Sequence, residues 1–240
     1  MEIIWFSFQR LSNRWFLLRI PRANPHATWR QELLESGFLR VGRLDENMVI
    51  ELRRVLEEKI EKIDQRPCGE DLRVWGVESD IPSWRSLSEE ILGITAQIIG
   101  PRWEIATVMG NVVPPERASI GSGGGWHRDS NAPQYKIMIL LSDVHSVNDG
   151  AFVFFPGSHR FLTVIRTFNS NRRWRTFLNR WEEEDIPWPQ RNVRAALGVA
   201  GDMLLFDGAL IHRGSPNIDS SVRQAITFYL YPSKGRQLTF

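Results

Sequence analysis

The spacing of apolar residues changes at Trp103, and this change constrains the fold more than any other feature of the chain. Before Trp103, capping residues followed by apolar positions at helical spacing predict helices. After it, short apolar runs separated by Gly, Pro and Asn predict strands. The helices are expected over 29–36, 45–63 and 86–100, and the strands over 103–109, 135–141, 151–155, 193–199, 203–207 and 223–231. Helices followed by strands favour an α+β fold, in which a β-sandwich or barrel is backed by N-terminal helices, because a doubly wound sheet would alternate the two.

Length and composition indicate one globular domain. With 240 residues, of which 42% are hydrophobic and 24% charged, the chain is long enough to bury a core of its own. We expect a single domain over 1–240, with mainly helical support over 28–102 and a β core over 103–231. The single cysteine, Cys68, excludes an intramolecular disulfide and favours a reducing compartment, so we expect a cytoplasmic protein.

The charge pattern limits the partners. The net charge is only +2 and no long basic stripe is present, so we expect no nucleic-acid partner. Most positive residues are arginine, which suits an anionic substrate but can also reflect genome composition. The apolar and aromatic segment 1–20 is interrupted by polar residues and is too short to span a membrane. It is expected to pack on the flank of the domain, or alternatively to make peripheral contact with the cytoplasmic face of a membrane.

The segment around His127 carries the clearest chemical signal. His127 and Asp129 lie two residues apart, so an extended chain places both side chains on one face, and His212 on a later apolar run can supply a third ligand. Two imidazoles and one carboxylate are the ligand set of non-heme Fe(II) oxygenases. Arg223, eleven residues after His212, would place a cation beside such a metal, where it suits the distal carboxylate of a keto-acid cosubstrate.

Further motifs extend this signal over residues 28 to 231. They are Gly37 to Val41 after the first helix, Asp149 to Arg160 with its Pro-Gly-Ser-His corner, and Gly201 to Asp207 leading to His212 and Asn217. In this order the motifs resemble the phytanoyl-CoA dioxygenase branch of the Fe(II)/2-oxoglutarate-dependent oxygenases. The resemblance implies a double-stranded β-helix (jelly-roll, cupin-like) core and a hydroxylase that uses Fe(II), 2-oxoglutarate and O2. It also implies that His127, Asp129 and His212 bind the metal. Because Asp129 is not replaced by a small residue, hydroxylation is favoured over halogenation.

Other residues are weaker candidates for ligand contact. Asn111 and Thr227 are expected to contact the cosubstrate, Thr227 because strand alternation points it to the same side as Arg223. Arg128, Arg160 and Arg213 are expected to contact an anionic substrate. The chain is similar in this respect to the lipopolysaccharide Kdo hydroxylases, which would imply a lipid-linked acidic sugar. The alternative within the same class is an oxygenase that acts on a small carboxylate or a secondary metabolite by hydroxylation, desaturation or cyclisation. A non-catalytic ligand-binding protein of the same fold is the alternative function.

Residues 161–192 interrupt the predicted strands with interleaved arginines and aromatic residues. An insertion of this length between core strands is typical of a lid or a binding loop. Alternatively it is a scaffold helix, because Trp174, Phe177, Leu178 and Trp181 recur at helical spacing.

Overall fold

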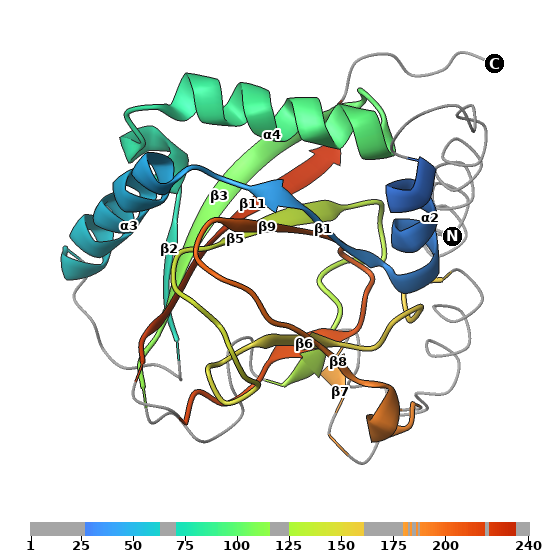
Figure 1. Cartoon of the computed structure of the whole chain (residues 1–240). Coiled ribbons are helices and arrows are strands. Elements are labelled where there is room, and N and C mark those ends of the chain that lie inside the picture. The colour runs from blue at the N-terminus through green and yellow to red at the C-terminus, as the bar shows by residue number, and fades with distance from the viewer. Residues whose placement is uncertain are drawn as a thin grey trace.

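The computed structural model describes residues 27–62, 71–115, 125–160, 180–181, 183, 186, 188–218 and 221–233. Its centre is formed by two antiparallel sheets that face each other (Figure 1). The six-stranded sheet has the order β1-β9-β5-β11-β3-β2, and the five-stranded sheet has the order β7-β4-β10-β6-β8. The predicted α+β fold with a jelly-roll core is confirmed.

The strands of the large sheet are β1 (Phe38–Arg43), β2 (Leu72–Trp75), β3 (Trp103–Val113), β5 (Tyr135–Leu140), β9 (Asp202–Asp207) and β11 (Arg223–Pro232). Those of the small sheet are β4 (Trp126–His127), β6 (Phe152–Phe154), β7 (Arg180–Trp181), β8 (Arg194–Ala196) and β10 (His212–Gly214). In the described part of the chain the helices are α2 (Ala27–Ser36), α3 (Glu46–Glu61) and α4 (Trp84–Ile99), with short 3-10 turns η1 (Val77–Asp80) and η3 (Gln190–Asn192). All six strands predicted from the sequence are present, and β1 and β2 are added to the large sheet from the segment that was predicted to be mainly helical.

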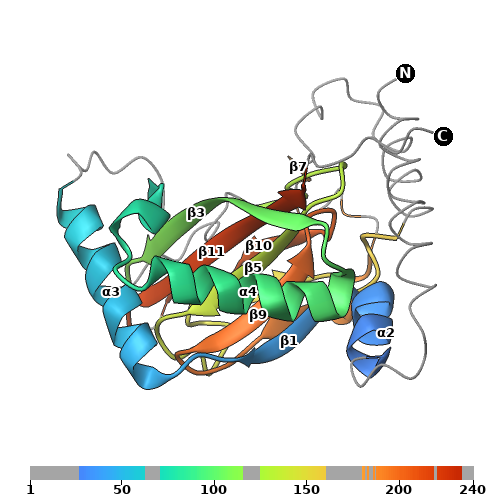
Figure 2. The ribbon, with the colours of Figure 1, turned by 90° about the horizontal axis from the view of Figure 1, so that it is seen from above.

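Helices α3 and α4 cross the outer face of the large sheet, and its inner face looks toward the small sheet (Figures 1 and 2). Every residue of β5 is therefore buried, since one side of the strand faces helices and the other faces the second sheet. One apolar cluster lies between helices and sheet, with Leu52, Leu87 and Phe228 fully buried, and a second lies between the sheets around Trp126 and Phe155.

The helix ends show how local sequence sets the elements. Asp45 caps α3 as predicted, because its side chain accepts a hydrogen bond from the Met48 amide at 3.0 Å. Gly37 ends α2 as predicted, with a left-handed φ of 81° and its amide bonded to the Leu33 carbonyl. The predicted start of α4 at Ser86 is wrong. The helix begins at Trp84, and the Ser86 hydroxyl instead donates to the Ser83 carbonyl at 3.0 Å.

Within the described residues, no helix is long and apolar enough to span a membrane. The segment 1–20, for which membrane contact was the alternative, lies outside the described residues.

Candidate metal and cosubstrate site

The small sheet brings the two predicted histidines together. His127 ends β4, His212 begins β10, and the two are direct cross-strand partners whose ring centroids are 4.4 Å apart. Asp129 follows β4 in a segment fixed by hydrogen bonds from its own amide and that of Ser130 to the Gly208 carbonyl. One ligand atom from each of His127, Asp129 and His212 lies within 4.8 Å of the others.

Both imidazole rings are oriented by the backbone. His127 Nδ1 lies 2.8 Å from the Gly125 carbonyl, and His212 Nδ1 lies 2.8 Å from the Leu210 carbonyl. A carbonyl oxygen can only accept, so each Nδ1 carries the proton and each Nε2 presents a lone pair. Both Nε2 atoms face Asp129, at 3.7 Å from Oδ1 for His127 and 3.2 Å from Oδ2 for His212. Three ligands on one face of an octahedral ion, with bonds of about 2.1 Å, lie about 3 Å apart, so the spacing suits a divalent metal.

The electrostatics of His127 and Asp129 favour the protonation states that a metal requires. Burial, with a smaller contribution from His212, lowers the pKa of His127 to about 3, so this imidazole is neutral at physiological pH. Burial alone would raise the pKa of Asp129, but His212 and Lys136 outweigh it and hold that pKa well below its usual range. A neutral imidazole and an ionised carboxylate are the forms that bind a metal without first releasing a proton.

Lys136, on β5, approaches the carboxylate from the large sheet. Its Nζ lies 2.8 Å from Asp129 Oδ2 and 4.0 Å from the centre of the Tyr229 ring, and the residue is 4% exposed. Burial lowers the pKa of Lys136, while the Asp129 carboxylate acts in the opposite direction. Lys136 therefore neutralises one oxygen of Asp129 and leaves Oδ1 toward His127.

Arg223 begins β11 and is buried, with 5% of its surface exposed. Its Nη1 donates to Asn111 Oδ1 at 2.5 Å, and its Nη2 lies 3.1 Å from Met138 Sδ. Burial lowers the pKa of Arg223 to about 10, which leaves the guanidinium charged at physiological pH. The Arg223 guanidinium thus lies in the pocket lining as a buried cation, and its role as a clamp on the cosubstrate stays a prediction.

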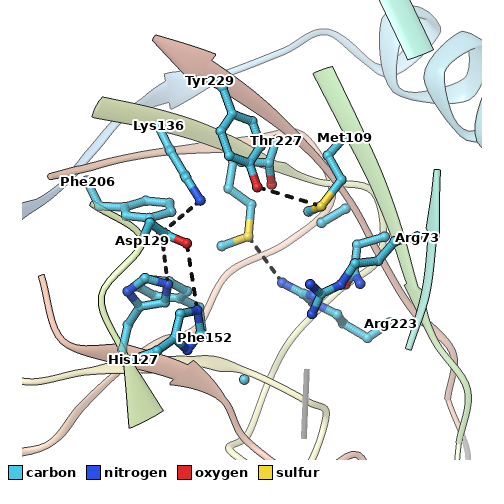
Figure 3. Close-up of a pocket in the computed structure, with 15 residues that line it drawn as sticks. Arg73, Met109, His127, Asp129, Lys136, Phe152, Phe206, Arg223, Thr227 and Tyr229 are labelled. Atoms are coloured by element: carbon cyan, nitrogen blue, oxygen red, sulfur yellow. Dashed lines mark hydrogen bonds and ion pairs between the residues drawn. The ribbon is translucent and has the colours of Figure 1, made fainter. Parts of the chain in front are cut away.

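These side chains line one pocket of about 80 Å³, shown in Figure 3. His127 and Asp129 lie at one side of it, and Arg223 lies at the other (Figure 3). Thr227 lines the pocket together with Ala225 and Arg223, as the predicted strand alternation requires. Asn111 also lines it, but its amide is already bonded at both ends, to Arg223 and to Asp71. Asn111 therefore holds Arg223 in the structure, and its direct contact with the cosubstrate stays a prediction.

The three arginines predicted to contact substrate lie elsewhere. Arg128 is buried and donates to the Ala209 and Ser158 carbonyls, and Arg160 donates to the Glu35 carbonyl. Arg213 forms an ion pair with Glu183 at 2.7 Å. None of the three belongs to the pocket lining in the described part of the chain, so the structure gives the predicted contact no support.

Most of the insertion 161–192, including Trp174, Phe177 and Leu178, lies outside the described residues, so its role as a lid stays a prediction. Trp181 lies in strand β7 and pairs with Trp126, so the helical spacing does not describe it.

Sequence reasoning missed Arg73, Asp71 and the contact of Lys136 with Asp129. Lys136 could have been identified from the sequence, because it is a charged residue in the otherwise apolar strand Tyr135–Leu140. Arg73 and Asp71 could not have been identified in this way, because the edge strand β2 is only four residues long and shows no recognisable strand pattern in the sequence.

The comparisons with known proteins agree with this site. The family model for phytanoyl-CoA dioxygenase (PhyH) matches residues 45–225, and the chain therefore belongs to this family. A comparison with curated proteins finds no match.

Solved structures show the same fold at low sequence identity. AviO1 from Streptomyces viridochromogenes Tue57 is 20% identical, with a TM-score of 0.65 over 90% of this chain and 99% of its own. The epimerase SnoN from nogalamycin biosynthesis, solved with Fe3+, α-ketoglutarate and nogalamycin RO, is 15% identical, with a TM-score of 0.63 over 85% and 82%. HygX from Streptomyces hygroscopicus, solved with nickel, 2-oxoglutarate and hygromycin B, is 16% identical, with a TM-score of 0.59 over 91% of each chain.

Proposed function

We propose that this protein is an Fe(II)- and 2-oxoglutarate-dependent dioxygenase that hydroxylates an unactivated carbon of a small molecule. The observation that carries the proposal is the convergence of His127 Nε2, His212 Nε2 and the Asp129 carboxylate on one point, across the pocket from a buried arginine. Family membership and the ligands bound in SnoN and HygX support the same chemistry.

The residues present fit the metal and the cosubstrate. Each imidazole has its Nδ1 committed to a carbonyl and its Nε2 free, and three ligands on one face leave the opposite positions open. Arg223 would hold the distal carboxylate of 2-oxoglutarate by charge-assisted hydrogen bonds. When bound, iron and 2-oxoglutarate supply the oxygen activation.

The pocket lining also includes the aromatic residues Phe152 and Phe206. Phe152 and Phe206 pack against His212 with ring centroids at 4.8 and 5.5 Å. The Phe152 ring stacks on the imidazole and the Phe206 ring meets it edge-on, so both rings help to hold its orientation. Thr227 and Tyr229 complete the wall on β11 and limit the room beside the open positions.

The ligands of the structural neighbours support a small-molecule substrate. SnoN and HygX were solved with nogalamycin RO and hygromycin B, which supports a secondary metabolite rather than a macromolecule. The hypothesis of a lipid-linked acidic sugar such as Kdo rested in part on Arg128, Arg160 and Arg213, and each of these has partners outside the pocket. Its other grounds, the segment 1–20 and most of the insertion 161–192, lie outside the described residues. The proposal therefore stays with small molecules.

The test is metal-dependent turnover of 2-oxoglutarate by the full chain. We expect the protein loaded anaerobically with Fe(II) to release succinate from 2-oxoglutarate and to consume O2. The His212→Ala variant should lose both, whereas His145→Ala, which replaces an exposed histidine beside Asp143, should retain them. A correctly folded wild-type protein that neither binds Fe(II) nor forms succinate would contradict the proposal and favour the non-catalytic alternative.

A further inference from the structure

Each of the two strands that carry a histidine ligand also carries a neighbouring side chain that points away from the ligands. His127 and His212 are antiparallel cross-strand partners, so Trp126, one residue before the first, lies opposite Arg213, one residue after the second. Alternation along each strand turns these two side chains away from the metal ligands. The two side chains touch, since the Arg213 guanidinium lies 4.6 Å from the centre of the Trp126 ring.

A single carboxylate oxygen bonds to both of these side chains. Glu183 Oε2 accepts a hydrogen bond from Trp126 Nε1 at 3.1 Å and forms an ion pair with Arg213 Nη1 at 2.7 Å. Trp126 is 1% exposed, so its indole N–H needs an acceptor within the protein. Glu183 thus bridges β4 and β10, and we call Glu183, Trp126 and Arg213 the clip.

Glu183 follows strand β7, in the last part of the insertion. In the pairing of β7 with β4, Trp181 lies opposite Trp126 and Arg180 lies opposite His127. Strand β4 is only two residues long, and its neighbours in the small sheet are β7 and β10. The position of His127 is therefore set by contacts on both sides of a very short strand.

We propose that Glu183 is a positioning residue for the metal site, which clips β4 to β10 and so sets the spacing of the two histidine ligands. This inference rests on the proposed function. A strand of two residues makes few backbone hydrogen bonds, so side-chain contacts carry a larger share of its placement. The clip holds the His127 and His212 rings at their centroid distance of 4.4 Å through a residue that does not touch the metal.

The clip also couples the insertion to the metal site. If the contacts of Glu183 favour metal binding, metal binding favours those contacts by the same factor, because linkage between two binding events is reciprocal. We therefore expect hydrogen exchange at the amides of Arg180 and Trp181 to slow when the wild type binds Co(II). The same addition should slow exchange less in Glu183→Ala.

The main experiment measures Co(II) binding by variants of Glu183. Titration of the metal-free full chain in competition with a chelator gives the affinity, and the ligand-field absorption bands of bound Co(II) report the coordination geometry. We expect Glu183→Ala to weaken Co(II) binding about tenfold, the low end for residues that orient metal ligands, and to alter the bands. Glu183→Gln keeps an acceptor for Trp126 but loses the charge, so its affinity should lie between those of Glu183→Ala and the wild type.

A double-mutant cycle tests whether Glu183 acts through its two partners. Trp126→Phe keeps an aromatic ring but removes the N–H, and Arg213→Met removes the ion pair. Each should weaken Co(II) binding in the wild-type background and have a clearly smaller effect in the Glu183→Ala background, because the contact is already absent there. Fully additive effects would show that Glu183 does not act through these side chains and would overturn the clip.

Controls separate the clip from the proposed function and from general stability. Glu58→Ala removes an exposed carboxylate paired with Arg54 on α3 and should leave the affinity and the bands unchanged. A Glu183→Ala variant that unfolds at a lower temperature without metal, but keeps wild-type affinity and bands, overturns the clip alone. If Glu183→Ala does not fold, Glu183→Gln and Trp126→Phe decide the question by the same two measurements. A wild-type protein that does not bind Co(II) overturns the proposed function and the clip together.

Discussion

Replacing Lys136 by methionine should destabilise the metal-free protein much more than the metal-loaded protein. Lys136 Nζ lies 2.8 Å from Asp129 Oδ2, and both side chains are largely buried, with 5% and 18% exposed. Methionine keeps most of the length and apolar contact of the lysine stem, so the loss of positive charge is the main change. In the metal-free protein this change leaves the Asp129 carboxylate without its closest cation.

The expected loss of stability follows from the burial of the Lys136–Asp129 ion pair. Removing one partner of a buried ion pair costs roughly 3 to 5 kcal/mol, because the remaining charge is left uncompensated. For a chain of this size each kcal/mol shifts the midpoint of thermal unfolding by about 2 to 4 °C, so we expect Tm to fall by roughly 6 to 20 °C. A divalent cation at His127, Asp129 and His212 supplies the missing positive charge, so the loss should shrink to at most about half with excess metal.

The assay is thermal unfolding of wild type and Lys136→Met, followed by circular dichroism with a chelator and with excess Zn²⁺ or Co²⁺. Lys59→Met is the matched control, because Lys59 forms an ion pair with Asp80 at a more exposed site far from the pocket lining, and its loss should be smaller and independent of metal. Equal losses for Lys136→Met with and without metal would refute the reasoning, since they would show that Lys136 does not compensate the charge of Asp129.

Three further predictions test the site and the core. Alanine at His127, Asp129 or His212 should abolish binding of Fe(II), measured by anaerobic titration, without unfolding the chain, and full oxygen uptake by any of them would remove that residue from the ligand set. Arg223→Ala should weaken 2-oxoglutarate binding by about 10- to 150-fold in calorimetry with little change in metal affinity, because it deletes charge-assisted hydrogen bonds of about 1.5 to 3 kcal/mol. Gly110→Ala should cost about 1 to 3 kcal/mol in denaturant unfolding, since its Cβ would lie 2.3 Å from Leu56 Cδ1 and 2.8 Å from Val74 Cγ2, and an unchanged midpoint would show that these buried side chains shift to make room.

The parts of the fold that the sequence predicts are those with a strong local period. Helix α3 shows apolar residues at helical spacing behind an Asp45 cap, and it begins and ends within two residues of the predicted bounds. Strand β11 alternates from Arg223 to Thr227 and lies where it was expected. In both elements, the side chains that the rest of the structure buries are those that the apolar spacing of the segment already places on one face.

The parts that the sequence does not predict depend on pairing between distant segments. Strands β4, β7 and β10 are two or three residues long, too short to show a period. Strand β2 takes its register from β3, so Arg73 enters the pocket only because Asn111 lies opposite to it. The start of α4 is set by residues before the capping pattern at Ser86, which the isolated sequence signal cannot reveal.

Strand alternation also explains why Arg128 and Arg213, which were expected to contact the substrate, lie outside the pocket lining. Arg128 lies between His127 and Asp129, and Arg213 follows His212, so side chains that alternate along an extended chain must point away from the metal ligands. The contacts agree, because Arg128 donates to the Ala209 and Ser158 carbonyls and Arg213 pairs with Glu183. The same rule that places two ligands on one face thus excludes their immediate neighbours from the pocket. Cations that meet an anion there have to come from the facing sheet, which is where Lys136, Arg73 and Arg223 lie.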